Sequence, residues 1–315
     1  MKGSCSRSVP LKFQLGDWIL FSVKLRLHVQ TASLLDSSSP VESLTVREEL
    51  LLNGNEGYSI RGLPISGRMP RVSFDGRYLF YVPLQYKHYF IDLQMSVDEY
   101  QRKFSAKTRS TIKRKIRKYA EHCGGSIGWK EYKTPDEIRE FIHLARALSK
   151  MTYQEKLLNA GIPKSDEFLR RAEDLASEQR VRGYILYDRD RPVSYLYCPA
   201  QNGVLIYAYL GYDPAYRNMS VGMVLHWLAV TRMLEERNFR YFDFTEGESE
   251  HKRLFATGWK ECANIIVLKR TLANTLIVYA HLSIECLSKW LGNLLDRLGF
   301  KTTVKRILRF GRQGE

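Results

Sequence analysis

The sequence predicts an α/β (α+β) fold built on a mixed sheet, and two patterns support this prediction. Residues 204–211, 221–237 and 240–244 form, in order, an apolar strand, a long helix and a second strand. A strand, a crossover helix and a strand of this length make a parallel pair with a right-handed connection. Before them, apolar strands at 181–188 and 192–199 are joined by a short charged turn, which favours an antiparallel hairpin. An Asn-Gly turn then leads into the first strand of the parallel pair.

Helix-start signals place further elements between residues 126 and 270. Thr134, Pro135 and Glu137 form a capping box with proline in the first turn, so a helix begins there and runs to about residue 149. Ser165 caps a second helix that ends near residue 178. The other elements expected in this stretch are a strand at 126–133, a short helix near 248–256 and a strand at 262–270.

The first hundred residues carry fewer signals. Residues 21–30 alternate between apolar and polar side chains, which is typical of a half-buried strand. The elements expected next are a loop at 31–40, a short helix near 42–52, strands near 58–62 and 78–83, and a long basic helix at 97–121. We therefore divide the chain into an N-terminal subdomain (1–100), a basic linking helix (101–125), a main domain (126–270) and an amphipathic helix with a basic tail (271–315).

Composition narrows the classes of protein to consider. Hydrophobic residues make up 44% of the chain, enough for a real core. The five cysteines are scattered and show no Cys-x-x-Cys or Cys/His spacing, so a disulfide framework, structural zinc and a metal cofactor are not expected. The N-terminus has no apolar core like that of a signal peptide, and no run of about 20 apolar residues occurs, so a cytoplasmic protein is expected.

The net charge of +15 is concentrated in two segments. Residues 101–133 hold eleven Lys and Arg against two acids, and residues 287–315 hold seven against two. The rest of the chain is close to neutral. Basic patches of this kind concentrate anionic partners, which here means a nucleotide-type cofactor, RNA or an anionic lipid surface.

The start of the 221–237 helix is the predicted phosphate site. Small residues, Ser220 and Gly222, stand where backbone N–H groups lack partners inside the helix, and such an end binds phosphate or pyrophosphate. The alternative is an ordinary N-cap in which Ser220 satisfies the first turn. The residues assigned to this cofactor-binding segment are Arg217, Asn218, Met219, Ser220, Val221 and Gly222.

The order of elements from 126 to 270 resembles the Gcn5-related N-acetyltransferase (GNAT) fold. Five stretches within residues 75–270 also resemble one GNAT subfamily, the Fem-like acyltransferases often found with bacterial exopolysaccharide or cellulose synthesis systems. These stretches are Phe104-Ser-Ala-Lys-Thr-Arg-Ser-Thr-Ile-Lys-Arg-Lys115, Tyr212-Asp-Pro-Ala, Ser220-Val-Gly222, Asp243-Phe-Thr-Glu-Gly247 and His251-Lys252. The resemblance implies a partial GNAT-like fold for the N-terminal subdomain as well.

The resemblance implies that an acyl thioester, usually acetyl-CoA or another acyl-CoA, lies between splayed strands at 203–211 and 240–245. The superfamily's phosphate loop has a glycine where this chain has Ser220. Serine keeps its N–H and adds a hydroxyl, but it restricts the backbone more than glycine does. More distant Fem-type relatives use aminoacyl-tRNA, so an RNA-borne acyl group is the alternative donor.

Candidate catalytic residues gather at the end of the 240–244 strand, where ligand sites in open α/β sheets lie. We expect Glu246 to remove a proton from the attacking amine and Asp243 to organise the loop. The resemblance implies that Lys252 is a cation facing the acyl carbonyl or a donor phosphate. His251 could act as an acid or base, but we rank it below Lys252 as a catalytic candidate. One of Tyr207 and Tyr209 would protonate the leaving thiolate, and Tyr209 is the residue chosen. For the acidic residues, the alternative is a solvated loop without a catalytic role. For Lys252, it is an ordinary surface lysine. For the two tyrosines, it is aromatic packing within the strand.

The basic segment 102–118 holds nine Lys and Arg and no acid. Like charges on one helix repel, so an anionic substrate is expected there, with Arg109 and Arg114 as its contacts; the alternative is a solvated helix. The C-terminal helix and tail would suit an anionic membrane surface, although packing on the domain is preferred.

Together the sequence and the resemblance predict a bacterial, cytoplasmic GNAT-type N-acyltransferase acting on an amine-bearing small molecule or glycan. The acceptor is expected to be an amino sugar of a surface-polysaccharide precursor. The alternatives are a transferase dependent on aminoacyl-tRNA and a non-catalytic, membrane-peripheral module of a polysaccharide assembly.

Overall fold

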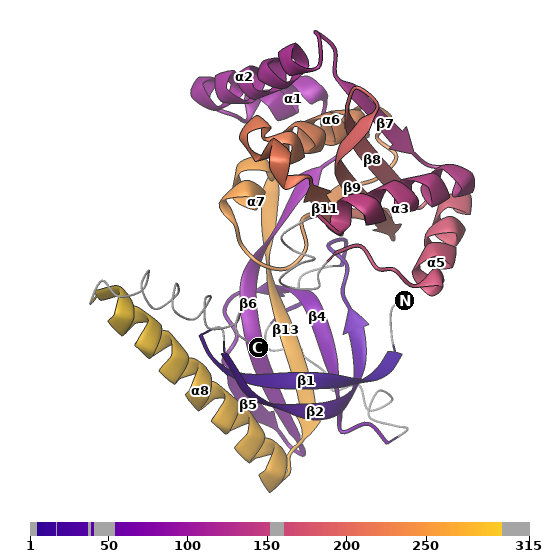
Figure 1. Ribbon diagram of the computed structural model, residues 1–315. Helices are drawn as coiled ribbons and strands as arrows, with labels where there is room; N and C mark the ends of the chain where they lie inside the picture. The colour runs from indigo at the N-terminus through magenta and orange to yellow at the C-terminus, as the bar shows by residue number, and fades with distance from the viewer. Residues whose placement is uncertain (1–4, 17, 37–38, 41–53, 152–160, 298–315) are drawn as a thin grey trace, which may run out of the picture. The chain divides into compact units, whose positions relative to one another are not determined.

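The structure is a computed structural model that describes residues 5–16, 18–36, 39–40, 54–151 and 161–297 (Figure 1). The chain forms two compact units. Unit 1 contains residues 1–32, 38–85 and 262–315, and unit 2 contains residues 33–37 and 86–261. Strands β6 (Tyr78–Asp92) and β13 (Gly258–Lys269) each run from one unit into the other.

Unit 1 is a sheet with one helix. Its other strands are β1 (Cys5–Leu15), β2 (Trp18–Thr31), β3 (Ser39–Pro40), β4 (Gly57–Ser66) and β5 (Val72–Asp75). β1 and β2 form a long antiparallel hairpin, β2 pairs parallel with β4, and β4 pairs antiparallel with β13. The helix α8 (Leu272–Arg297) packs on β1, with Val278 in the core beside Phe13, Leu27 and Leu268.

The alternation predicted for 21–30 is confirmed from Leu25 to Val29, where the apolar side chains are buried. Phe21 is half exposed, so the alternation stops short of the hairpin tip. The short helix predicted near 42–52 lies outside the described residues.

The predicted basic helix 97–121 is two helices in the structure. α1 (Val97–Arg102) and α2 (Ala106–His122) are separated at Ser105, whose side chain accepts a hydrogen bond from the backbone N–H of Thr108 and caps α2. The prediction of one helix was wrong because the basic composition hid a Ser-x-x-Thr cap inside the pattern. The break lets Phe104 turn inward, where it is buried.

Unit 2 is a sheet covered by helices on both faces. Its remaining strands are β7 (Gly128–Tyr132), β8 (Val181–Asp188), β9 (Arg191–Gln201), β10 (Val204–Ile206), β11 (Tyr209–Tyr212) and β12 (Tyr241–Asp243). Its other helices are α3 (Pro135–Ser149), α5 (Asp166–Ser177), the 3-10 helix η3 (Pro214–Met219), α6 (Val221–Glu236) and α7 (Glu250–Phe255). The capping box at Thr134 and the cap at Ser165 form as predicted.

Alternate residues of β8 and β9 face different helical layers. Tyr184 and Leu196 join the core with α6 and α2, whereas Ile185 and Tyr195 join the core with α3 and α5. The strands are therefore buried on both sides, which accounts for their continuous apolar sequences. The predicted mixed α/β fold is confirmed: the β8–β9 hairpin is antiparallel, and the β10–β12 pair joined by α6 is parallel.

The predicted strand 203–211 divides into β10 and β11, and this division creates a gap. β10 pairs with both β9 and β12, and the N–H of Tyr207 still donates to the carbonyl of Asp243 at 2.8 Å. Among the described strands, β11 pairs only with β9. The chain thus diverges from β12 after Tyr207, which opens the sheet on that side.

Candidate functional site

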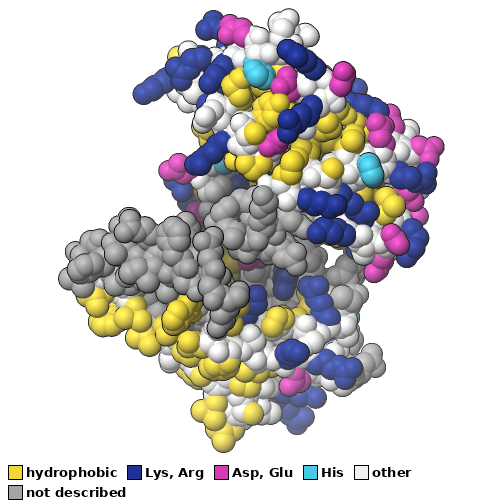
Figure 2. All heavy atoms as spheres, in the orientation of Figure 1, with side chains coloured by type: hydrophobic (Ala, Val, Ile, Leu, Met, Phe, Trp, Pro, Cys, Tyr) yellow, Lys and Arg dark blue, Asp and Glu magenta, His cyan; other side chains and the backbone are white. Residues whose placement is uncertain are grey.

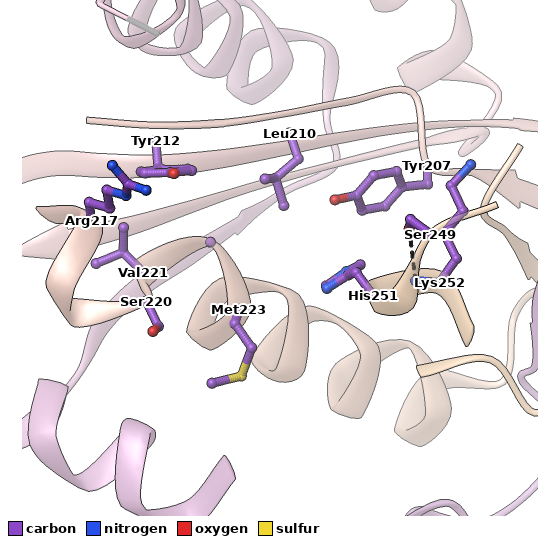
Figure 3. A pocket seen from close by; sticks show the side chains of 11 residues that line it. Tyr207, Leu210, Tyr212, Arg217, Ser220, Val221, Met223, Ser249, His251 and Lys252 are labelled. Atoms are coloured by element: carbon purple, nitrogen blue, oxygen red, sulfur yellow. Dashed lines mark hydrogen bonds between the residues drawn. The ribbon is translucent and has the colours of Figure 1, made fainter. Parts of the chain in front are cut away.

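A pocket of about 440 Å³ in unit 2 occupies this opening. Its walls come from β11, the end of η3 with the first turn of α6, and the start of α7 (Figure 3). The lining residues are Tyr207, Leu210, Tyr212, Arg217, Ser220, Val221, Gly222, Met223, Ser249, His251 and Lys252. Figure 3 shows Arg217 at one end and Tyr207 with His251 at the other.

The Arg217 end of the pocket is suited to an anion. Ser220 adopts the left-handed conformation (φ 54°, ψ 35°) and its side chain makes no cap hydrogen bond, so the ordinary N-cap alternative is wrong. The N–H groups of Val221 and Gly222 have no acceptor within the helix, which begins at Val221. Free N–H groups, the positive end of the helix dipole and the Arg217 guanidinium therefore meet in one place.

Two of the six predicted cofactor-binding residues do not line the pocket. The carbonyl of Asn218 accepts a hydrogen bond from Lys118 Nζ at 3.2 Å, and Met219 packs against the hydrophobic core. Both belong to η3, as does Arg217, whose side chain does reach the pocket. Arg217, Ser220, Val221 and Gly222 line the pocket as predicted.

The middle of the pocket is narrow and apolar. Leu210 and Tyr212 of β11 stand opposite Gly222 of α6. A Cβ at position 222 would lie 3.4 Å from Leu210 Cδ2 and 3.5 Å from a Tyr212 ring carbon. These are ordinary contacts, so alanine fits there, but any larger side chain would project between the two walls and fill the pocket.

The opposite end of the pocket holds groups that can exchange protons. Burial raises the pKa of Tyr207, so its hydroxyl stays protonated and can donate. Burial, with a smaller contribution from the Lys252 charge, lowers the pKa of His251, so its imidazole is neutral near pH 7. The His251 Nε2 atom is buried and has no hydrogen-bond partner among the residues described. A neutral, unpartnered imidazole can accept a proton from a bound group.

His226 lies directly behind this end of the pocket and was not singled out from the sequence. It is fully buried on α6, its ring centroid lies 4.9 Å from that of His251, and burial lowers its pKa well below the usual range. The ring also contacts Phe242 and Phe255. No local pattern in the sequence marks it, because a histidine inside an apolar helix looks the same whether or not it stands beside a pocket.

Lys252 lines the pocket, and its side chain forms hydrogen bonds that hold the loop before α7 in place. Its Nζ donates to the carbonyls of Glu246 at 2.7 Å and Thr245 at 3.3 Å, and burial lowers its pKa. Ser249 caps the helix by accepting from the backbone N–H of Lys252. The Glu246 side chain is exposed and is not among the pocket-lining groups, so its assignment as the base stays a prediction.

Asp243 sits at the end of β12 as an organising residue. Its carboxylate pairs with His88 Nε2 and accepts from the backbone N–H of Thr245 at 2.6 Å. The second bond holds Thr245 at a positive φ of 62°, which turns the chain toward α7. Both contacts are made to Oδ1, which suits this oxygen to shaping the loop, and the organising role of Asp243 stays a prediction.

Tyr209 does not face the pocket, contrary to the prediction. Its ring lies against Phe168 and Tyr197 on the α5 side of the sheet. The break between β10 and β11 interrupts the regular alternation, so Tyr207 is the tyrosine whose hydroxyl points into the pocket (Figure 3).

Arg109 and Arg114 lie together on α2, along a separate surface hollow of about 630 Å³. Its other lining residues are Ala106, Ser110, Lys113 and Arg117. Arg109 is anchored, because its Nη1 donates to the carbonyl of Phe104 at 2.6 Å. The two predicted substrate contacts thus share a basic surface, and their binding role stays a prediction.

Among the residues that the structure describes, no group of three or more His, Cys, Asp or Glu side chains is placed to hold a metal ion. None of the helices that the structure describes is both long and apolar enough to cross a bilayer.

Comparison with known families identifies the class of domain. Residues 106–253, which include the pocket and α2, match the family described as an acetyltransferase (GNAT) domain. The stretch is therefore similar to GNAT acetyltransferase domains, and this match bears out the predicted enzyme class, a GNAT-type acyltransferase. No curated protein matches this chain significantly.

Among solved structures, FemX supports the fold, and two others are similar at lower scores. FemX aligns with a TM-score of 0.51 at 10% identity, over 88% of this chain and 91% of its own. L-PGS from Bacillus licheniformis aligns with a TM-score of 0.48 at 14% identity, over 75% and 76% of the two chains. The C-terminal domain (DUF2156) of a putative lysylphosphatidylglycerol synthetase from Agrobacterium fabrum gives 0.46 at 8% identity, over 72% of each.

Proposed function

We propose that this chain transfers an acyl group from an acyl-CoA thioester to the nitrogen of an amine. The observation that supports the proposal is the way in which the polarity of the pocket changes from one end to the other. One end offers helix N–H groups and Arg217, the middle is narrow and apolar, and the far end carries Tyr207, His251 and Lys252. The chemical groups of a CoA thioester follow one another in the same order: a charged pyrophosphate, a slender arm and a reactive carbonyl.

The donor would be held mainly by the backbone. The N–H groups of Val221 and Gly222 would receive the pyrophosphate, with Arg217 supplying a countercharge. Gly222 leaves the arm room to pass Leu210. The thioester supplies an activated acyl group, and the protein supplies its position relative to the amine.

Proton movements would fall to the far end of the pocket. The attacking amine must lose a proton as the C–N bond forms, and His251 Nε2 is neutral and free to accept it. Glu246, on the loop beside Lys252, is the predicted alternative and would act through water. The leaving sulfur needs a proton, and Tyr207, whose hydroxyl points into the pocket, would donate it. Lys252 would stabilise negative charge that develops on the acyl oxygen.

The acceptor is proposed from the resemblance to Fem-like acyltransferases alone. It would be an amine on a surface-polysaccharide precursor, an amino sugar in the simplest case, and the setting would be the bacterial cytoplasm. The basic hollow on α2, with Arg109 and Arg114, would attract an acceptor or donor that carries phosphate.

Calorimetric titration with acetyl-CoA and with desulfo-CoA tests the donor site. Gly222→Asp places a bulky carboxylate at the proposed pyrophosphate position, so its Kd should rise by about 100-fold or more, which corresponds to about 2.7 kcal/mol. Gly222→Ala should bind within about threefold of the wild type, because its Cβ makes only ordinary contacts. Gly292→Asp is the matched control, since a Cβ there meets no atom within 4 Å. Equal binding by wild type and Gly222→Asp would remove the proposed site.

An aminoacyl group carried by tRNA is the second candidate donor, and the exposed charge of α2 favours it. Lys113, Arg114 and Arg117 all line the hollow on this helix. RNA binding releases counterions, so log K would fall linearly with log salt, by about 0.9 for each phosphate contacted in a duplex. A steep salt slope for tRNA, lost in Arg114→Gln, together with no acyl-CoA binding, would replace the CoA proposal. No binding of either donor would favour a non-catalytic module.

A further inference from the structure

Helix α8 in unit 1 exposes an apolar face. Its exposed large side chains recur three, four or eight residues apart, so they share one side of the helix. They are Leu272, Leu276, Tyr279, Leu287, Trp290 and Leu294, and Leu272 is 77% and Trp290 59% exposed. Figure 2 shows hydrophobic side chains gathered along the edge of the unit that α8 forms. Lys289 is the one charged residue on this exposed side among the described residues.

The inner face of α8 combines apolar packing, with Val278 in the core, and polar contacts to the sheet. Glu285 forms an ion pair with Arg71 of the sheet. His281 Nδ1 lies 2.6 Å from the Tyr81 hydroxyl, and its Nε2 lies 3.1 Å from the carbonyl of Lys12. A helix on the surface of a water-soluble domain normally has apolar groups inward and charges outward, and a helix that is apolar on both sides is normally buried. Because α8 also buries Val278 on its inner side, its exposed apolar face indicates that this face meets something other than water.

The tip of the β1–β2 hairpin extends the same surface. The N–H of Gly16 donates to Ser288 Oγ at 2.8 Å, so the tip lies against the second half of α8. Just past the tip, Trp18, Ile19, Leu20 and Phe21 are each between 48% and 61% exposed. Two tryptophans, Trp18 and Trp290, thus stand on neighbouring elements, and tryptophan and tyrosine are the residues that concentrate at membrane–water interfaces.

We propose that this surface, defined as the outer face of α8 with residues 18–21, docks on an anionic lipid bilayer. The sequence that follows α8 supplies the matching charge, because residues 298–315 contain five Lys and Arg and one acid. The bases are Lys301, Lys305, Arg306, Arg309 and Arg312. An apolar helical face next to a basic segment lies in the bilayer interface and binds anionic lipid, with each basic residue adding to the attraction.

A second copy of the chain is the competing occupant, and the composition of the face argues against it. Paired helices place charged residues beside the apolar seam to set register and partner. Apart from Lys289, the exposed residues beside this seam are small or uncharged: Ala273, Ala280, Ser283, Cys286 and Asn293. A lipid surface needs no register, so a seam with a single charged flanking residue fits lipid better.

Vesicle co-sedimentation of the full-length chain tests the proposal. Vesicles of phosphatidylcholine alone are compared with vesicles that also contain phosphatidylglycerol. The chain should bind the anionic vesicles at low salt, and the double variant Leu276→Gln/Trp290→Gln should bind them about tenfold or more weakly, since it removes apolar area from the interface. Lys305→Gln/Arg306→Gln/Arg309→Gln should lose binding to a similar extent, and only for the anionic vesicles.

Leu35→Gln is the matched control, because Leu35 is a large apolar side chain that is 45% exposed but lies outside this surface. It should bind vesicles like the wild type, and all variants should keep the acyl-CoA affinity of the wild type, which separates this proposal from the proposed function. Failure of the wild type to bind anionic vesicles, or equal binding by the double variant, would overturn it. So would a dimer in light scattering that the double variant abolishes, because the face would then be an interface between copies.

Discussion

The pocket beside α6 and the outer face of α8 are both open to solvent, but they are built in opposite ways. The pocket depends on backbone: Ser220 in a left-handed conformation, the N–H groups that follow it, and the absence of a side chain at Gly222. The α8 surface depends on side chains, with ten exposed apolar groups from two elements sharing the area.

This difference predicts how each region tolerates substitution. A site formed by a few backbone groups is blocked when a substitution adds one side chain inside it. Single substitutions in the pocket should therefore have large effects on binding. A surface that works through summed area loses a small part with each change, so the effects should be small and nearly additive. The following predictions test that contrast, beginning with the largest expected effect.

Tyr207→Phe should lower kcat by about 100-fold while the Kd for acyl-CoA changes by less than about threefold, since the hydroxyl acts on the leaving group and not on the phosphates. Steady-state kinetics with calorimetry measure both values. Tyr209→Phe is the matched control and should be nearly neutral, because that ring faces Phe168 and Tyr197. A larger kcat loss in Tyr209→Phe than in Tyr207→Phe would contradict the placement of these two side chains.

Single substitutions on the α8 surface should each weaken binding to phosphatidylglycerol vesicles by only about three- to fivefold, since each removes the transfer energy of one partly buried side chain. Leu276→Gln and Trp290→Gln are compared with their double variant, whose effect should approach the product of the two. A single substitution that abolished binding would show that this surface contains a specific site, and the contrast with the pocket would then fail.

His226 should make the protein less stable in acid. Its pKa is lowered in the folded state and stays near 6.5 in the unfolded state, so stability is complete above about pH 6.5 and is lost as pH falls from there toward the folded pKa. Between pH 7.5 and 5.5 this one group should remove about 1.4 kcal/mol, if the folded state stays unprotonated throughout.

Thermal unfolding at the two pH values measures this effect. His226→Leu should show a smaller drop in Tm than the wild type, and the comparison uses the difference between pH values because the substitution also changes packing. His143→Gln, on an exposed part of α3, should keep the drop seen in the wild type. Equal drops in wild type and His226→Leu would mean that other groups determine the acid sensitivity.

Ser220→Gly should have the smallest effect. Glycine adopts the left-handed conformation without strain, so the free energy of unfolding should rise or stay within about 1 kcal/mol, and acyl-CoA affinity should stay within about threefold. Chemical denaturation and calorimetry measure the two quantities. A large loss of affinity would show that the serine hydroxyl, rather than the backbone conformation, carries the binding, and the pocket would then depend on side chains as α8 does.

The sequence by itself determined the elements whose signals are local. The capping residues Thr134 and Ser165 begin α3 and α5 as predicted, and the apolar runs with their short turns specify the β8–β9 hairpin and the parallel β10–β12 pair. Ser220 and Gly222 could be placed at a helix start for the same reason: caps and turns are made by residues a few positions apart.

Only the tertiary structure decided which side chains share a site. The break after Tyr207 put that tyrosine, and not Tyr209, in the pocket, because β10 is held by β12 while β11 follows β9. His226 meets His251 across 25 positions of sequence, and His88 reaches Asp243 across 155. Which face of α8 turns toward the sheet also depended on partners far away in the chain, Arg71 and Tyr81. Such contacts follow from how the strands pair and the helices pack, and no local pattern of residues encodes them.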